Sequence, residues 1–323
     1  MTPSRTSKRK AISIPLSALG VIILIATIAG FIPNIQFCDV ASHFRLVYIA
    51  ILGLILVPLL MVRSTFGILI VAVGFVINSV PIILASLPRA CLCADNSQMV
   101  SILNYNSEFQ VNNRVDLLRK EIEKKQPDII ALVEINQRWI DELQPSIEVY
   151  KHRKSAIDGP GLALLSKFPI ERAEVNHYGK SNHPRIIATL LVGNQHLNVI
   201  VVHPTTPKPS GFLERNQELK LVTEEAKSLA SPKMVIGDLN CTQFSPVFKQ
   251  FAAAGLDDSS QGAGLQPTWP ARVGRVIPFV PIPPVVPIDH LLVSKDICVV
   301  KREVGPPIAS DHLPVFLTIK MAK

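Results

Sequence analysis

Residues 234–240 read Met-Val-Ile-Gly-Asp-Leu-Asn, and this stretch decides how the sequence around it is interpreted. Met234–Ile236 is a short aliphatic run of the kind that forms a buried strand. Asp238 and Asn240 follow it, and side chains two residues apart leave an extended chain on the same side. Two oxygen donors on one side suit a metal ion or a phosphoryl group, whereas the alternative is a plain Gly/Asp/Asn turn.

Similar aliphatic runs recur on both sides of this stretch, with helical patterns between them. The other expected strands are Val100–Leu103, Ile129–Val133, Leu162–Leu165, Ile186–Val192, Leu197–Val202, Ile288–Val293 and Val315–Ile319. Apolar residues recur at helical spacing in Asn113–Lys125, Asn136–Leu143 and Phe212–Leu229. This alternation of strands and helices predicts an α/β or α+β domain with extensive sheet.

Polar residues stand at the ends of these runs, where a sheet can present side chains to a cleft. Besides Asp238 and Asn240, they are Asn104, Glu134, His203, Asp289, Asp311 and His312. Each one alone has an ordinary explanation, such as a turn, a charge at a helix N-terminus or a solvated histidine. Together they combine oxygen ligands with two histidines and a further aspartate. The set predicts a site for a hard cation with acid–base groups beside it, which suits phosphate ester hydrolysis.

Three apolar stretches occupy the N-terminal third, at Ala11–Ile32, Leu46–Val62 and Thr65–Leu87. Each is close to the roughly 20 residues that a helix needs to cross a bilayer, and none has a charge in its interior. We therefore expect residues 1–95 to be a membrane anchor of three transmembrane helices and residues 96–323 to be a catalytic domain. A cleaved signal peptide would explain the first stretch alone.

The distribution of charge predicts the topology. Arg5, Lys8, Arg9 and Lys10 precede the first apolar stretch and should stay in the cytoplasm, so three crossings place residues 96–323 outside it. The net charge of +8 divides into +5 for residues 1–95 and +3 for the remainder, which does not indicate a strongly basic nucleic-acid-binding body. The five cysteines form no zinc-binding pattern; Cys91 and Cys93 are either unpaired or part of an extracytoplasmic disulfide.

Seven motifs, in order over nearly all of residues 99–320, resemble the endonuclease/exonuclease/phosphatase superfamily. They are N-Y-N, V-E-I-N, G-x-A-L-L-S-K-F-P-I, V-V-H-P, I-G-D-L-N, I-D-H-L-L-V-S and S-D-H-L-P-V. The resemblance implies an α/β fold, a four-layer sandwich of two packed β-sheets flanked by helices, with the site at one mouth of the sandwich. It also implies dependence on Mg²⁺ or Mn²⁺.

The resemblance also implies a role for each polar residue. Glu134 would be the principal metal ligand, with Asn104 and Asp311 near the ion. Asp238 and Asn240 would orient the nucleophile and bind the phosphate. His312 would be the general base or a donor to a phosphoryl oxygen, oriented by Asp289, and His203 would support the leaving group or the phosphoryl oxygens. Abasic-site nucleases of the superfamily tend to have tyrosine at the position of His203, which counts against that activity.

The anchor and the T-W-P…P-I-D-H segment are similar to a bacterial membrane-anchored branch that includes VanJ-type glycopeptide-resistance proteins. That branch is associated with polyprenyl-phosphate chemistry outside the cytoplasm. The leading hypothesis is therefore a membrane-anchored phosphoric ester hydrolase, with lipid-linked phosphate or pyrophosphate among its substrates. An extracytoplasmic nuclease is the alternative, and a catalytically silent binding module that keeps the fold is a third.

The segment 271–287 contains Pro278, Pro281, Pro283, Pro284 and Pro287 and is otherwise mostly apolar. Its prolines predict a loop rather than a helix or a central strand. Two hypotheses stand side by side. In one the segment folds back as core, and in the other it grips a lipid chain, with Phe279 against the chain and Arg272 and Arg275 at the headgroup.

Overall fold

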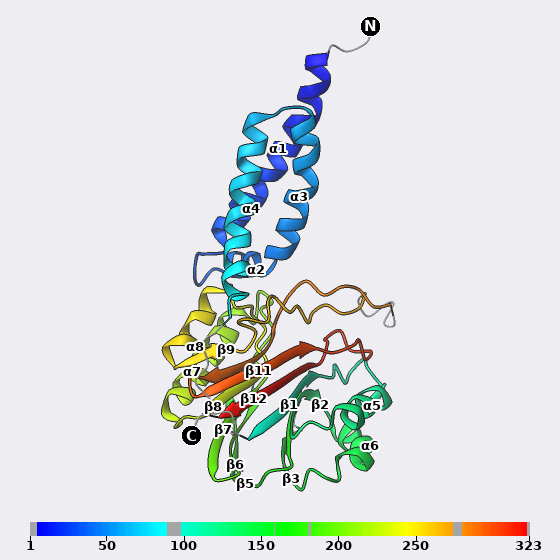
Figure 1. Ribbon diagram of the computed structural model, residues 1–323, viewed down its shortest axis with the longest axis vertical. Coiled ribbons are helices and arrows are strands. Elements are labelled where there is room, and N and C mark those ends of the chain that lie inside the picture. Colours follow the sequence, from blue (N-terminus) through cyan, green and yellow to red (C-terminus); the bar gives the residue numbers. More distant parts are fainter. Residues whose placement is uncertain (1–4, 89–97, 158, 180–181, 274–279, 322–323) are drawn as a thin grey trace. The chain divides into compact units, whose positions relative to one another are not determined.

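The computed structural model describes residues 5–88, 98–157, 159–179, 182–273 and 280–321. Two compact units make up the chain: Met1–Ala85 with Phe244–Pro246, and Ser86–Gln243 with Val247–Lys323. We refer to them as the helical unit and the sheet unit, and each is described by itself (Figure 1).

The helical unit contains the apolar stretches. Its helices are α1 (Arg5–Ala29), α2 (Gln36–His43), α3 (Arg45–Met61) and α4 (Thr65–Ala85). In the described chain, α1 and α4 are each long and apolar enough to cross a membrane. The short helix α2 meets α3 at a bend of 67°, and if this pair counts as one span the number rises to three. Within the unit, buried Asn78 donates to the Thr27 hydroxyl at 2.9 Å, a polar contact that holds α4 against α1.

The sheet unit contains two six-stranded mixed sheets. The first has the order β11-β12-β1-β2-β4-β3, and the second has the order β5-β6-β7-β8-β10-β9. The strands of the first sheet are β1 (Met99–Asn106), β2 (Ile129–Ile135), β3 (His152–Ala156), β4 (Gly161–Ser166), β11 (Ile297–Val304) and β12 (Val315–Met321). Those of the second are β5 (Ile170–Tyr178), β6 (His183–Val192), β7 (Gln195–Val202), β8 (Lys233–Asp238), β9 (Leu256–Asp258) and β10 (Asp289–Ser294).

Three apolar clusters separate four layers. Aliphatic side chains from both sheets, among them Ile102 and Leu291, fill the space between the sheets. Helices α5 (Val115–Lys125) and α6 (Gln137–Ile147) cover the outer face of the first sheet, and α7 (Phe212–Ser228) and α8 (Lys249–Ala253) cover that of the second. Figure 1 shows α5 and α6 beside β1 and β2, and α7 and α8 at the opposite side of the unit. The expected sandwich of two packed sheets flanked by helices is confirmed.

All eight expected strands and all three expected soluble helices are present, with boundaries shifted by a few residues. Sequence analysis missed β3, β5, β9 and β11. All four lie at sheet edges, and β3, β5 and β11 expose polar residues, so these three lack the continuous aliphatic run that marked the others. The fourth, β9, is only three residues long.

The described parts of the proline-rich segment, 271–273 and 280–287, contain no helix and no central strand, as its composition predicts, and together with residues 269–270 we call them the ribbon. Isolated bridges join Trp269 to Val286 and Arg272 to Pro281. In these parts, Val273 and Val280 are exposed, whereas Ala271 and Val286 are buried. Arg275 and Phe279 lie outside the described residues.

Candidate active site

The predicted site residues come from neighbouring strands of both sheets. Glu134 lies in β2, and Asp238 and Asp289 belong to the adjacent strands β8 and β10. His203 follows β7, and Asp311 and His312 precede β12. Because all these positions lie at corresponding strand ends, the sandwich gathers residues as far apart in the chain as Glu134 and His312.

The shortest contact in this cluster joins His312 to Asp289. His312 Nδ1 lies 2.8 Å from Asp289 Oδ2, and both side chains are almost completely buried. Burial opposes a charge on His312, but the carboxylates of Asp289 and Asp238 outweigh it and raise the histidine pKa well above its ordinary value. The pair is therefore an imidazolium–carboxylate dyad in the structure, with His312 Nε2 directed toward the remaining carboxylates.

Asp238 lies between the two histidines. Its Oδ2 is 3.6 Å from His312 Nε2 and 3.5 Å from His203 Nε2, and its Oδ1 accepts the backbone N–H of Asn240 at 2.8 Å. Burial alone would raise the pKa of Asp238, but the two histidines lower it to about 2. Asp238 is consequently ionised at any physiological pH. One carboxylate oxygen of Asp238, one of Asp289 and one ring nitrogen of His312 all lie within 4.8 Å of one another, so these three residues could contact the same metal ion.

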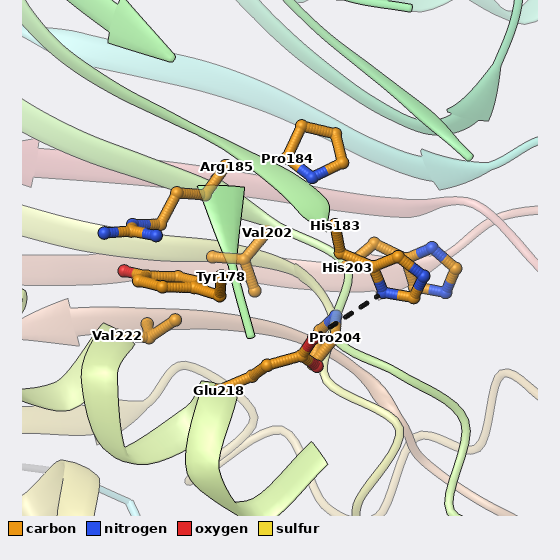
Figure 2. A pocket seen from close by; sticks show the side chains of 9 residues that line it. All are labelled: Tyr178, His183, Pro184, Arg185, Val202, His203, Pro204, Glu218 and Val222. Carbon is orange, nitrogen blue, oxygen red and sulfur yellow. Dashed lines mark ion pairs between the residues drawn. The ribbon is translucent and has the colours of Figure 1, made fainter. Parts of the chain in front are cut away.

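His203 approaches Glu134 as well as Asp238. Its Nε2 is 3.5 Å from Glu134 Oε1, and the pKa of His203 is raised because these carboxylates outweigh the effect of burial. On the other side of His203 is a small pocket that His183 and Glu218 help to line (Figure 2). The rings of His183 and His203 are nearly parallel, and their centroids are 6.2 Å apart. His203 therefore forms part of the boundary between the polar cluster and this pocket.

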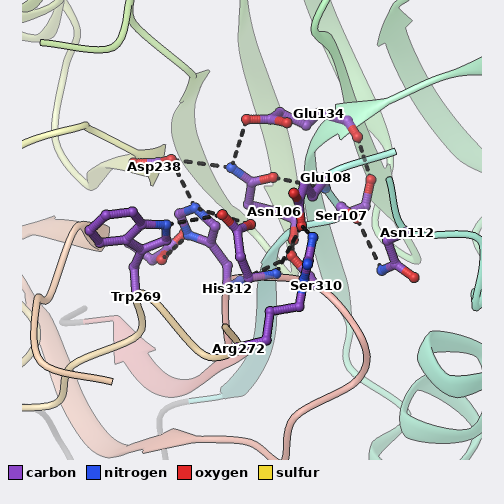
Figure 3. A network of polar contacts seen from close by, with 12 residues as sticks. Asn106, Ser107, Glu108, Asn112, Glu134, Asp238, Trp269, Arg272, Ser310 and His312 are labelled. Carbon is purple, nitrogen blue, oxygen red and sulfur yellow. Dashed lines mark hydrogen bonds and ion pairs between the residues drawn. The ribbon is translucent and has the colours of Figure 1, made fainter. Parts of the chain in front are cut away.

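Asn106, rather than Asn104, contacts the predicted ligands. Asn106 Nδ2 donates to Glu134 Oε1 at 3.2 Å and to Asp238 Oδ2 at 3.1 Å (Figure 3). Asn104 lies two residues earlier in β1, is fully buried, and has no hydrogen-bond partner for its side chain among the described residues. Sequence analysis missed Asn106 because it ended the strand at Leu103. The N-Y-N motif contained both residues, and the later one is closer to the strand end.

Asn240 is fixed in a left-handed conformation, with φ of 50°. Its side-chain amide donates to the carbonyl of Pro204 at 2.9 Å and lies 3.3 Å from His203 Nε2. The turn depends on Gly237, because a Cβ at that position would lie 1.8 Å from the carbonyl oxygen of Val202. The structure thus brings Asn240 beside His203.

A second group of contacts surrounds Asp311. The indole of Trp269 donates to Asp311 Oδ2 at 3.0 Å, and the backbone N–H of Asp311 donates to Glu108 Oε2 at 3.1 Å. Arg272 forms an ion pair with Glu108 and is almost completely buried, so it faces the carboxylates and not open solvent. Burial and the nearby Asp311 raise the pKa of Glu108. Glu108 and Trp269 were missed, although the T-W-P motif already contained the tryptophan.

The donor set fits a hard divalent cation. Carboxylates outnumber cationic side chains in the cluster, with Glu108, Glu134, Asp238, Asp289 and Asp311 around His203, His312 and Arg272. Of the two carboxylates that contact His203, Glu134 is more exposed to solvent than Asp238. The backbone of Glu134 has a φ of 51°. Oxygen ligands of this kind are those that Mg²⁺ and Mn²⁺ prefer. That Glu134 and Asp311 hold the ion stays a prediction, and the group whose possible ligand atoms lie within 4.8 Å of one another is Asp238, Asp289 and His312.

The fold and the polar cluster together define a class of phosphoester-cleaving proteins. The Endonuclease/Exonuclease/phosphatase family model matches residues 103–312, and the chain belongs to this family. Members of the family are generally metal-dependent hydrolases of phosphoester bonds. A search of curated proteins finds no significant match to the sequence.

Solved structures share the fold at low sequence identity. D. rerio TDP2 complexed with a single-strand DNA product has a TM-score of 0.58 at 18% identity, covering 69% of this chain and 100% of the other. A family protein from Beutenbergia cavernae DSM 12333 gives 0.56 at 20% identity, with 70% and 72% covered. One from Bacteroides thetaiotaomicron gives 0.57 at 16% identity, with 71% and 100% covered.

The raised pKa of His312 predicts a pH-dependent contribution to stability in the presence of a chelator. The contribution should be fully present below the unfolded pKa of 6.5 and should be lost as pH rises through the higher folded pKa. The difference in unfolding free energy between wild type and His312→Gln should therefore shrink as pH rises above about 6.5. Chemical denaturation at several pH values measures it. The exposed His196→Gln is the control and should give a difference near zero throughout; a constant difference for His312→Gln would contradict the charged dyad.

Proposed function

We propose that this chain is a membrane-anchored, Mg²⁺- or Mn²⁺-dependent phosphoric ester hydrolase whose catalytic domain, residues 96–323, acts outside the cytoplasm. The observation that carries the proposal is the buried His312–Asp289 dyad beside a cluster of carboxylates. A bound divalent ion would supply Lewis-acid stabilisation of the negative charge on the phosphoryl oxygens. The protein's own groups supply acid–base chemistry and orientation.

In the proposed reaction, the protonated His312 donates a hydrogen bond from Nε2 to a phosphoryl oxygen of the substrate. Asp289 keeps the opposite nitrogen, Nδ1, protonated and fixes the ring orientation. Asp238, held by its contact with Asn240, orients the attacking water, and the Asn240 amide contacts a phosphoryl oxygen. His203, with its raised pKa, donates to a phosphoryl oxygen or to the leaving group.

A lipid-linked phosphate or pyrophosphate is the proposed substrate. The apolar helices of the helical unit support it, because helices long and apolar enough to cross a membrane would give a tethered enzyme access to lipid substrates. Val273 and Val280 of the ribbon are exposed, and Trp269 of the same ribbon donates to Asp311. Arg272, Arg275 and Phe279 are the proposed substrate contacts. In the structure Arg272 pairs with Glu108, so it would have to exchange that partner for a phosphate.

An extracytoplasmic nuclease is the second candidate, favoured by the structural similarity to a TDP2 that was crystallised with a DNA product. The charge of residues 96–323, only +3, argues against it, since affinity for nucleic acid depends on neutralising several phosphates. Parallel assays with plasmid DNA, a polyprenyl pyrophosphate and a phosphodiester lipid distinguish the two candidates.

The active-site assignment predicts the effect of two substitutions. Glu134→Ala and His312→Ala should each lower metal-dependent hydrolysis at least about 10³-fold, because each removes a group that acts at the transition state. The double variant should lose little more than either single one. Steady-state kinetics with and without a chelator measure this, and circular dichroism checks the fold. Activity that survives chelation would contradict the role of the metal.

The lipid-substrate proposal predicts selective effects at the ribbon. Val273→Ser with Val280→Ser should weaken turnover of a lipid phosphate about 10-fold and leave a small soluble phosphodiester unaffected, because only the lipid needs an apolar contact. Val149→Ser with Val300→Ser, at exposed positions elsewhere, is the matched control. Equal loss on both substrates with a lower melting temperature would show that the ribbon has a packing role.

The topology proposal predicts that residues 96–323 are outside the cytoplasm. It is supported by the basic N-terminal cluster and by Cys298, which is disulfide-bonded, because disulfides persist mainly in oxidising compartments. Cys91 and Cys93 lie outside the described residues. Alkaline phosphatase fused after Lys323 should be active, and green fluorescent protein at the same position should be dark. The reverse pattern would refute the topology.

A further inference from the structure

The turn that carries Asn240 is held from behind by buried side chains that the proposed reaction does not use. Arg215 of α7 donates to the carbonyl of Asn240 at 2.6 Å, and His290 Nε2 lies 3.0 Å from the carbonyl of the next residue, Cys241. His290 is adjacent in sequence to the dyad residue Asp289, but consecutive side chains in a strand point to opposite faces. His290 therefore contacts the turn from the side away from the dyad.

A carboxylate on the neighbouring strand fixes the other nitrogen of His290. Asp258 Oδ2 in β9 lies 3.1 Å from His290 Nδ1, and Asp258 Oδ1 accepts the backbone N–H of Ser260 at 2.9 Å. The ring of Phe248 covers the imidazole, with centroids 4.8 Å apart. His290 is only 1% exposed, so water cannot easily replace these partners.

The partners of His290 determine its hydrogen-bonding role. A backbone carbonyl accepts hydrogen bonds and cannot donate, and the same is true of an ionised carboxylate. Although burial opposes ionisation, His290 holds the pKa of Asp258 well below its usual range, so this carboxylate is ionised. Both ring nitrogens therefore face acceptors and both donate, which makes His290 an imidazolium in a buried ion pair.

We propose that the Asp258–His290 ion pair is a positioning element that holds Asn240 in its left-handed conformation by fixing the Cys241 carbonyl. This inference rests on the proposed function of Asn240 as a phosphate contact. A left-handed asparagine costs free energy, and surrounding contacts must compensate for that cost. The structure thus contains two carboxylate–imidazole pairs on opposite faces of β10, Asp289–His312 facing the reaction and Asp258–His290 facing the turn.

The activity test compares two replacements of His290. His290→Leu removes the donor to Cys241 and should lower kcat on the order of 10- to 100-fold with little change in KM. His290→Gln can still donate to the carbonyl and should recover most of the lost kcat. His196→Leu is the matched control, since it disrupts an exposed pair with Glu171, and it should leave kcat unchanged. Equal losses for the leucine and glutamine variants would overturn the proposal.

A double-variant comparison separates positioning from general destabilisation. In an Asn240→Ala background, His290→Leu should cost little further activity, because the residue through which it acts is absent. The same fold-loss in both backgrounds, with a parallel drop in melting temperature, would assign His290 a general packing role and overturn the inference.

One measurement is independent of catalysis. In full-length protein labelled with ¹⁵N-histidine and solubilised in detergent, the His290 signals, assigned by their absence in His290→Leu, should show both nitrogens protonated at neutral pH. A neutral ring would overturn the ion pair. If wild type hydrolyses none of the tested phosphate esters, the proposed function fails, and the NMR result still decides the charge state of His290.

Discussion

The hydrogen bond between His312 and Asp289 is the interaction on which the candidate site depends. It joins the loop before β12 in the first sheet to β10 in the second, so it forms only when the two sheets pack in the correct register. Removing one partner from a buried ion pair leaves an uncompensated charge, which costs about 3–5 kcal/mol. The site therefore cannot form locally. It is a consequence of sheet packing, and the aliphatic layer between the sheets supplies the driving force.

The same dependence explains the arrangement of charges. A buried imidazolium is tolerated only because Asp289 and Asp238 are close to it, and these carboxylates are in turn stabilised by His312 and His203. Carboxylates nevertheless remain in excess, and Asn106 separates Glu134 from Asp238 by donating to both. A divalent cation would neutralise part of this excess negative charge. The same excess of carboxylates therefore shapes the polar cluster and favours the metal-dependent chemistry proposed for it.

Sequence patterns were sufficient for the fold, since buried strands carry aliphatic runs, and most of the predicted polar residues that follow these runs lie in one cluster. The errors have physical reasons. Asn104 and Asn106 share one face of β1, and which of them reaches Glu134 depends on where the strand ends, which composition does not specify. Glu108 and Arg272 pair across 164 positions, and no periodicity marks such a long-range contact. Edge strands were missed because they are only partly buried on either face.

The glycine and the asparagine of the G-D-L-N stretch link the packing of the strands to the geometry of the candidate site. Gly237 allows β8 to approach the Val202 carbonyl, which no other residue could do, and this approach places His203 beside Asn240. Asn240 then adopts a left-handed conformation that is unfavourable by itself, and it is held there by Asp238 on the reactive side and by Arg215 and His290 behind. A sharp turn that close packing requires thereby fixes the position of the Asn240 amide. Because the strain is stored in the turn and the restraints come from three different elements, the position of Asn240 is determined by the whole second sheet and α7, and not by the motif alone.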